Sequence, residues 1–374
     1  MNIVVDSALL ADALDEASKT LPKKEIIPVM GCFLIHAAGD KLTITGTDYR
    51  ATVQSYIEEN VQINSAGRAA LPKVLLEIIQ KIKGEVTIEV KKDQAIISSK
   101  NKAIEISGMD PDEYPSPPVI DNSEFIEIKG KDLKDLIRKT VFAADIDGKS
   151  MPIITGVHVV IQNGKLKMIA TNRHRIARVE KDIECAELGS AVVEARGIKE
   201  LQKIINDNDE VEFGFSKSDN GDVIYAFAQT ERFTFYSRVL EGSYPEVESL
   251  LRVSPITEIT VERSELIQSL ELVLTLARED KNNSVTLTCS SKEIIIKGQG
   301  KENGKAVESI MPVTFKGENF RITINAKYML EVLGILDMEQ ISIGYRGPIN
   351  PMSIEGVNDK SNYHVIMPYK VRND

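Results

Sequence analysis

Apolar residues recur at helical spacing near the start of the chain, where Leu10, Leu14 and Ala17 fall on one face. The same spacing returns in residues 133–144 and 266–277. We expect an amphipathic helix in each place, with Ser7 and Ser264 as N-caps of the first and the last.

A pair of alternating apolar and polar runs follows each of these helices. The three pairs are "CFLIHAAGDKLTITGTD", "GVHVVIQNGKLKMIATN" and "SVTLTCSSKEIIIKGQG". Such alternation around a short polar turn is typical of a β-hairpin, and Asn163-Gly164 is the strongest turn signal of the three.

A second helical pattern comes next in each third of the chain, in "LPKVLLEIIQKI", "ARGIKELQKIIND" and "NAKYMLEVLGILD". Pro72 suits the first turn of its helix. The apolar positions Ile78, Ile204 and Val332 are 126 and 128 residues apart, and alternating strands follow each helix. The sequence therefore predicts three repeated α+β domains, each with two helices packed on antiparallel sheet, in residues 1–124, 125–252 and 253–374.

Composition is that of a globular protein, with 42% hydrophobic and 27% charged residues in 374. No apolar run is long enough to span a bilayer, and the start does not have the pattern of a signal peptide, so we expect a cytoplasmic protein without membrane contact. The three cysteines lack metal or disulfide spacing, and we expect no metal and no cofactor.

The sequence contains no complete catalytic motif of a known kind. The stretch "GQGKENGKA" lacks the leading glycine and the hydroxyl of a phosphate loop, and the four histidines lack HExxH spacing. One stretch leaves several readings open: in "IATNRHRIARVE", His174 stands between Arg173 and Arg175. That cluster is a candidate catalytic centre, nucleic-acid contact or docking surface, and a hydrolase centred on His174 is the least favoured reading because no nucleophile context accompanies it.

The net charge of −10 argues against a protein that coats DNA by bulk attraction, but it allows a local basic surface. Lysine and arginine are frequent in and beside the predicted helices, from which we expect them to project outward. Nothing resembles a base-reading set, so any nucleic acid should be bound through its phosphates and without sequence preference. The lysines and arginines in and beside the predicted helices are Lys19, Lys23, Lys24, Lys73, Lys81, Lys83, Lys131, Lys134, Arg138, Lys139, Arg196, Lys199 and Lys203.

Together with the three repeats, the phrases "LTITGTDYR", "ALPKVLLEIIQKI", "ATNRHRIA", "EGSYPEV" and "HVIMPYKV" resemble the bacterial DNA polymerase III beta subunit family, the sliding clamps. The resemblance covers the whole chain in order. It implies three clamp domains per chain, a head-to-tail homodimeric ring around duplex DNA, and a processivity factor that is not an enzyme. Implied partners are the DNA polymerase III alpha subunit, the clamp loader, and repair polymerases or ligase, which bind through short linear motifs.

The resemblance also implies which residues carry these functions. A peptide-binding groove would use Ile154, Thr171, Arg173, His174, Arg175, Ile176, Pro245, Leu250, Leu251, Val365, Ile366, Met367, Pro368 and Tyr369. DNA contacts would come from Lys23, Lys24 and Lys149. The dimer interface would use Lys73, Val74, Ile104, Ile106, Leu276 and Ala277.

Some positions depart from the family pattern. Arg173 stands where the family usually has a small residue, and the expected third-domain interface mixes Lys305 and Glu308 where some members are rich in acids. Two alternatives therefore stay open beside the sliding clamp: a monomeric peptide-binding adaptor on the same fold, and a specialised second-copy clamp.

Overall fold

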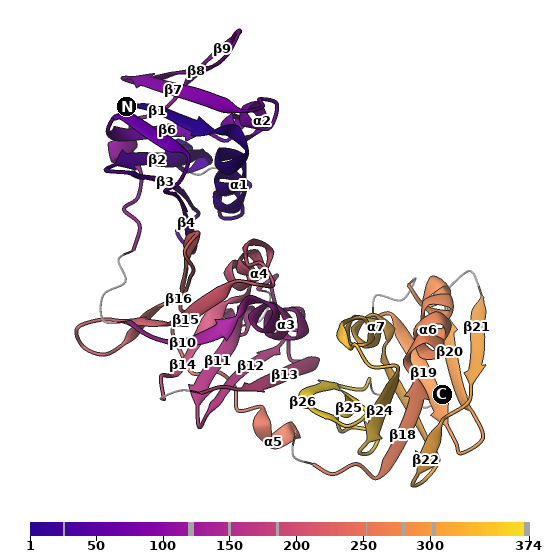
Figure 1. Cartoon of the computed structure of the whole chain (residues 1–374). Coiled ribbons are helices and arrows are strands. Elements are labelled where there is room, and N and C mark those ends of the chain that lie inside the picture. Colours follow the sequence, from indigo (N-terminus) through magenta and orange to yellow (C-terminus); the bar gives the residue numbers. More distant parts are fainter. Residues whose placement is uncertain are drawn as a thin grey trace. The chain divides into compact units, whose positions relative to one another are not determined.

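Sheets shared between the predicted repeats organise the chain, which is seen here in a computed structural model (Figure 1). Strand β4 (Ala51–Ile57) pairs with β17 (Phe233–Arg238), and β13 (Arg175–Asp182) pairs with β26 (Asp359–Ile366), both antiparallel. The chain divides into a first unit, Met1–Lys134 with Arg196–Leu240, and a second unit, Asp135–Ala195 with Glu241–Asp374. The structure describes residues 1–24, 27–118, 123–148, 151–184, 187–251, 253–278, 282–300 and 304–369.

Among the described residues, the first unit contains two antiparallel sheets. The larger has eight strands in the order β10 (Ser123–Lys129), β15 (Glu210–Lys217), β16 (Val223–Gln229), β17, β4, β3 (Lys41–Thr47), β2 (Cys32–Ala38) and β6 (Gly67–Pro72). The smaller has five, in the order β5 (Val61–Ser65), β1 (Asn2–Asp6), β7 (Glu85–Lys91), β8 (Gln94–Ser99) and β9 (Lys102–Ser107).

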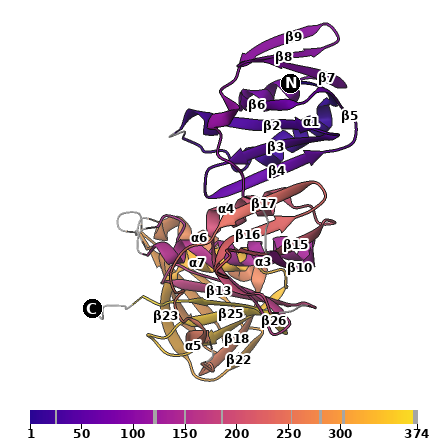
Figure 2. The same ribbon diagram turned by 90° about the vertical axis from the view of Figure 1, so that its left-hand side faces the viewer.

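Helices pack on these sheets where the apolar spacing predicts them (Figures 1 and 2). The apolar face of α1 (Ser7–Ser18) is buried at Leu10, Leu14 and Ala17, against β3 and β4. Burial of this face removes apolar surface from water and holds the helix on the sheet. The other helices of this unit are α2 (Val74–Ile79) and α4 (Ala195–Ile204), and two short 3-10 turns are η1 (Pro28–Gly31) and η2 (Pro111–Glu113).

The helix starts differ from the sequence prediction at three places. The carboxylate of Asp6 caps α1 by accepting the N–H of Ala8 at 2.8 Å, whereas Ser7 is the first helical residue and its hydroxyl donates to a distant carbonyl. Ser264 likewise lies inside α6 (Arg263–Ala277), which has no side-chain cap. Pro72 is the last residue of β6, where an edge strand tolerates its missing N–H.

The second unit repeats this plan. Its described residues form a nine-stranded sheet, in the order β14 (Gly189–Glu194), β11 (Gly156–Gln162), β12 (Lys165–Thr171), β13, β26, β25 (Met352–Gly356), β24 (Gln340–Tyr345), β18 (Thr257–Glu262) and β22 (Thr314–Lys316). A four-stranded sheet has the order β21 (Lys305–Ile310), β20 (Ile294–Gln299), β19 (Ser284–Cys289) and β23 (Phe320–Asn325). The helices are α3 (Gly130–Val141), which begins in the first unit, α5 (Glu248–Leu251), α6 and α7 (Ala326–Ile335), with the 3-10 turn η3 (Pro152–Thr155).

The turn predicted at Asn163-Gly164 is confirmed. Gln162 and Lys165 are paired at the ends of β11 and β12, and both turn residues have positive φ, +54° and +67°. Asparagine and glycine tolerate this conformation better than other residues, which is why their sequence signal is strong.

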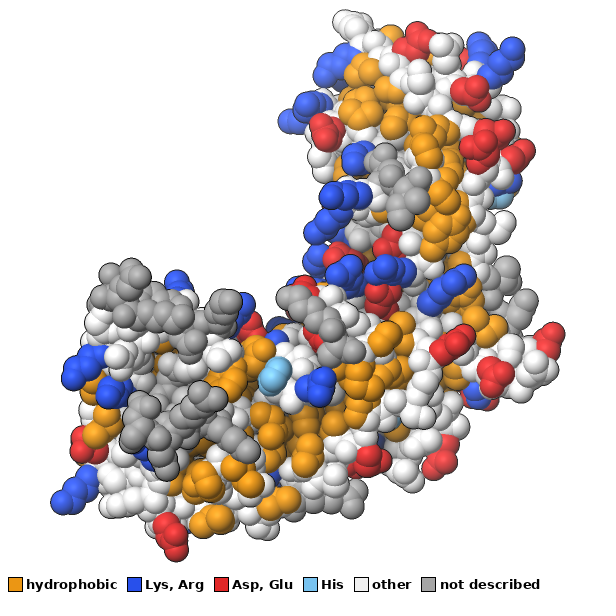
Figure 3. Space-filling view, turned by 180° about the vertical axis from the view of Figure 1, so that it is seen from behind, with side chains coloured by type: hydrophobic (Ala, Val, Ile, Leu, Met, Phe, Trp, Pro, Cys, Tyr) orange, Lys and Arg blue, Asp and Glu red, His pale blue; other side chains and the backbone are white. Residues whose placement is uncertain are grey.

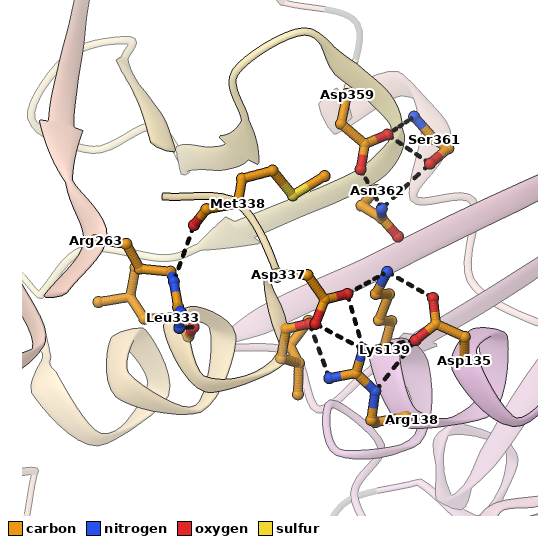
Figure 4. Close-up of polar contacts among 11 residues, drawn as sticks. Asp135, Arg138, Lys139, Arg263, Leu333, Asp337, Met338, Asp359, Ser361 and Asn362 are labelled. Atoms are coloured by element: carbon orange, nitrogen blue, oxygen red, sulfur yellow. Dashed lines mark hydrogen bonds and ion pairs between the residues drawn. The ribbon is translucent and has the colours of Figure 1, made fainter. Parts of the chain in front are cut away.

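One predicted surface lysine is buried. Lys139 on α3 is only 6% exposed, and its ammonium lies 2.6 Å from Asp135 and 3.1 Å from Asp337 (Figure 4). Burial alone would lower the pKa of Lys139, but hydrogen bonds to the two carboxylates outweigh it and raise the pKa above its ordinary value. Arg138 also contacts both aspartates. The expectation that Lys139 projects outward is therefore wrong, whereas Arg138 is partly exposed.

Within the described parts of the chain, no helix combines the length and the apolar character needed to cross a membrane.

Candidate functional site

The turn between β12 and β13 contains the arginine and histidine cluster. The hydroxyl of Thr171 donates to the carbonyl of Arg175 at 2.7 Å and accepts the N–H of Arg173 at 3.1 Å. The side-chain oxygen of Asn172 accepts the N–H groups of His174 and Arg175, each at 3.1 Å. These four bonds fix the turn and hold Arg173 at a φ of +75°. A positive φ favours glycine. This explains why the clamp family, as the resemblance implies, usually has a small residue at this position.

The end of β26 is fastened to this turn. The backbone N–H of Met367 donates to the carbonyl of His174 at 2.8 Å, and Ile366 lies opposite Arg175 in the strand ladder. The segment that follows β26 therefore runs beside the turn, although nearly two hundred residues separate them in the sequence. Register thus brings together two of the predicted groove segments.

Arg175 is a buried cation. Its side chain is 8% exposed, and its guanidinium contacts the Glu331 carboxylate and the carbonyl of Phe142. The aromatic rings of Tyr328 and Phe142 lie 4.4 and 5.0 Å from it. An arginine held in this way positions the turn and leaves little of its surface for a ligand.

A cavity of about 710 Å³ opens on one side of the turn. Arg173 and His174 are exposed there, and the lining mixes acidic and basic side chains. Its residues are Phe142, Ala144, Asp145, Ile146, Asp147, Asn172, Arg173, His174, Arg175, Lys327, Tyr328 and Glu331.

An apolar cluster joins predicted groove residues from three segments. Ile176, Val365 and Leu251 belong to it, and Figure 3 shows hydrophobic side chains gathered beside an exposed histidine and a basic side chain. Apolar surface with a few polar groups at its edge suits an extended peptide with large apolar side chains. The cluster consists of Ile169, Ile176, Val247 and Val365, with Tyr244, Leu251 and Tyr363 packed against it.

The short helix α5 is held beside this cluster by Arg346. The guanidinium of Arg346 donates to the carbonyls of Leu250 at 3.0 Å and Leu251 at 3.3 Å, and it contacts the Tyr363 hydroxyl. Arg346 is 4% exposed, whereas the Leu250 side chain is 43% exposed. Sequence reasoning missed Arg346, because nothing local distinguishes it from a surface arginine.

The remaining predicted groove residues differ in exposure. Ile154, Val365 and Ile366 have no exposed surface, so they offer none to a ligand. The other four, which are partly buried, are Pro245, Met367, Pro368 and Tyr369.

The predicted DNA-contact residues lie in the segments after α1 and after α3. Lys23 and Lys24 are both exposed, and Lys149 lies outside the described residues. Figure 3 shows lysine and arginine side chains gathered along one side of the first unit. Of the lysines and arginines predicted in and beside the helices, the exposed ones are Lys23, Lys24, Lys73, Lys81, Lys83, Lys131, Arg196, Lys199 and Lys203.

The predicted interface residues lie on the two smaller sheets and their helices. Val74 on α2 is 41% exposed, and Ile104 and Ile106 on β9 are half-buried. Lys73 is exposed and Leu276 half-buried, but Ala277 has no exposed surface because it packs into the core under α6.

The histidines do not form a catalytic arrangement. His364 on β26 is fully buried, and neither of its ring nitrogens has a hydrogen-bond partner among the residues that the structure describes. Burial, helped by the charge of Lys139, lowers the pKa of His364 to about 3. His158 stacks on Tyr244 with ring centres 5.1 Å apart. Across the described residues, no three His, Cys, Asp or Glu side chains are placed to hold a metal ion.

Comparison with known proteins agrees with this architecture over the whole chain. Three models of the DNA polymerase III beta subunit match in order: the N-terminal domain at residues 1–118, the central domain at 127–246 and the C-terminal domain at 250–370. The beta sliding clamp of Bacillus subtilis is 31% identical over 99% of this chain and 100% of its own, and that of Halalkalibacterium halodurans is 29% identical over the same shares. The crystal structure of the DNA polymerase sliding clamp from Bacillus subtilis covers both chains fully, with a TM-score of 0.93 and 30% identity. The chain therefore belongs to the DNA polymerase III beta subunit family, the beta sliding clamps.

Proposed function

We propose that this sliding clamp encircles duplex DNA as a head-to-tail homodimer and tethers polymerases through a peptide-binding groove, without catalysing a reaction. The observation that carries the proposal is the ordered match of three clamp domains over the full chain. We take the domains as residues 1–124, 125–252 and 253–374. A sliding contact has to be weak and blind to sequence, so retention comes from closure of the ring.

Two free sheet edges support the homodimer. Strand β9 ends the five-stranded sheet and β21 ends the four-stranded sheet, and within the described residues each has a strand on one side only. A free edge offers unpaired N–H and carbonyl groups to another chain. Pairing β9 of one copy with β21 of the other uses both edges and closes a ring. Contacts would come from Lys73, Val74, Ile104, Ile106 and Leu276. Ala277, the last residue of α6, would instead pack that helix onto the core.

The exposed lysines and arginines in and beside the helices would bind the phosphates of duplex DNA. Lys23 and Lys24 are exposed, and neither forms an ion pair with an acidic side chain among the described residues, so they are the strongest individual candidates. Lys134 and Lys203 instead pair with Asp207 and Glu200, which reduces their value as phosphate contacts. The proposed DNA contact of Lys149 rests only on the resemblance to the clamp family.

Partner proteins would dock at the turn and the apolar cluster. Leu250 and Met367 would contact the partner's large apolar side chains, while Arg173 and His174 would meet its polar groups. We expect the DNA polymerase III alpha subunit, the clamp loader, and repair polymerases or ligase to share this site through short linear motifs.

The monomeric adaptor is not favoured, since full-length relatives are named beta sliding clamps. A specialised second-copy clamp would differ mainly in partner choice, and Arg173 is the residue that supports this variant of the proposal.

Sedimentation analysis of the full chain tests the proposal, with and without a peptide that carries adjacent leucine and phenylalanine residues. We expect a dimer that binds one peptide per chain. A monomer that persists at micromolar concentration would contradict the proposed dimeric ring. A dimer that does not bind the peptide would contradict the proposed peptide-binding groove.

A further inference from the structure

The first unit contains a second copy of the turn that organises the candidate site. The hydroxyl of Thr47 donates to the carbonyl of Ala51 at 3.1 Å and accepts the N–H of Tyr49 at 3.2 Å. The Asp48 carboxylate accepts the N–H groups of Arg50 and Ala51, at 3.0 and 2.9 Å. Tyr49 has a φ of +68°. These bonds correspond one for one to those of the turn that begins at Thr171.

The neighbouring strand end is repeated as well. The backbone N–H of Arg238, at the end of β17, donates to the carbonyl of Arg50 at 2.9 Å. Met367 makes the same bond to His174 at 2.8 Å in the second unit. Arg238 therefore occupies the place of Met367, and Arg50 that of His174.

A cavity of about 310 Å³ lies at this second turn. Its walls come from the turn, from β16 and β17, and from the proline-rich segment after Tyr114. The residues that line it include Tyr49, Arg50, Pro117, Tyr225, Tyr236 and Arg238.

The chemistry of this cavity differs from that of the first site. Three tyrosines and two arginines line it, and none of its described lining residues is acidic, although the whole chain has a net charge of −10. Tyr225 and Tyr236 meet edge to face with ring centres 6.5 Å apart. Guanidinium groups bind carboxylates through paired hydrogen bonds, and tyrosine rings pack against proline or aromatic side chains.

We propose that this cavity is a second docking site, which binds an extended acidic peptide segment of a partner protein. A carboxylate of the peptide pairs with Arg238, and a ring or proline side chain packs on Tyr49 and Tyr225. That the ligand is a peptide rests on the proposed function of the first site, because the two turns are built alike. The preference for acidic residues rests on the cavity itself.

Fluorescence anisotropy with the full-length chain tests this proposal. The first probe is a labelled peptide of about ten residues with a central phenylalanine between glutamates, and a matched peptide has glutamine in place of glutamate. The second probe is the leucine and phenylalanine peptide for the first site. We expect the acidic probe to bind the wild type, with an affinity that falls about tenfold in Arg238→Ala and in Tyr49→Gly. Glycine at position 49 keeps the positive φ while it removes the ring.

Two variants act as matched controls. Arg196→Ala removes an exposed arginine of the same unit that does not line the cavity, and Met367→Asp disables the first site. Neither should weaken the acidic probe. Arg238→Lys keeps the charge but loses the paired hydrogen bonds, so we expect an intermediate loss of affinity.

Three outcomes would overturn the second site: no binding of the acidic probe to the wild type, an affinity unchanged in Arg238→Ala, or full displacement by duplex DNA carrying an equal number of charges. If the second probe still binds the wild type and fails with Met367→Asp, only the second site is refuted. Failure of the second probe on the wild type refutes the proposed function instead.

Discussion

The backbone N–H of Met367 lies 2.8 Å from the carbonyl oxygen of His174, so the chain that leaves β26 is fastened to the turn between β12 and β13. The Met367 side chain is partly buried at that point. Two segments far apart in sequence thus form one surface, and the function proposed for it depends on both.

Met367→Asp should weaken binding of a leucine and phenylalanine peptide by about tenfold or more, because a charge replaces an apolar contact in a desolvated site. Dimer mass should not change. Anisotropy and sedimentation measure the two effects. Met311→Asp changes a methionine that is 74% exposed in the same unit and is the matched control. Equal losses in both variants would show that Met367 has no special role.

Arg173→Gly should raise the free energy of unfolding by roughly 0.5 kcal/mol, since relief of the left-handed backbone slightly exceeds the added entropy of the unfolded chain. Arg178→Gly, within strand β13, should instead lower it by about 1 kcal/mol. Chemical denaturation measures both. A loss of stability in Arg173→Gly as large as in Arg178→Gly would contradict the backbone argument.

His364 should make the protein less stable as pH falls. Its pKa in the folded protein is about 3, below the ordinary value of 6.5, so between these values the unfolded chain takes up a proton that the folded chain excludes. Stability is therefore complete above pH 6.5 and decreases toward pH 3, by up to about 1.4 kcal/mol per pH unit from this group.

Chemical denaturation at pH 4, 5, 6 and 7 tests this prediction. His364→Leu should reduce the slope of unfolding free energy against pH by about one proton. His36→Leu, which changes an exposed histidine on β2, should leave the slope close to that of the wild type. Identical slopes in the wild type and His364→Leu would show that burial does not keep His364 neutral.

Lys24→Ala should weaken binding to duplex DNA at low salt and should have a smaller effect at high salt, because a phosphate contact is screened. The slope of log affinity against log salt should fall by about one. Lys360→Ala, which removes an exposed lysine on strand β26, is the control for loss of one positive charge. Equal binding by Lys24→Ala and the wild type at low salt would remove Lys24 from the DNA surface.

Local patterns in the sequence predict the helices and hairpins well, because they depend on spacing along the chain. The apolar positions of α1 and the turn at Asn163-Gly164 are both found as expected. The short strands β1, β10 and β18 before the helices were missed, since five to seven residues carry little pattern. Helix caps were misplaced by one or two residues for a similar reason, as Asp6 shows.

Long-range partners could not be predicted from patterning. Lys139 is buried because Asp337, almost two hundred residues away, lies beside it, and Arg346 is buried because it meets the carbonyls of α5. The groove residues were named from the resemblance to the clamp family. The second turn at Thr47 did leave a signal, because "TDYRA" repeats the pattern of "TNRHR", with a Thr-Asx pair at the same place.

We propose that the protein holds DNA by encircling it. The most direct measurement is gel filtration of the protein loaded on a nicked circular plasmid, compared with the same complex after one restriction cut. Protein that stays with the circle and leaves the linear DNA within minutes is the result predicted by a closed ring. Equal retention on both forms, or equal loss from both, would contradict it.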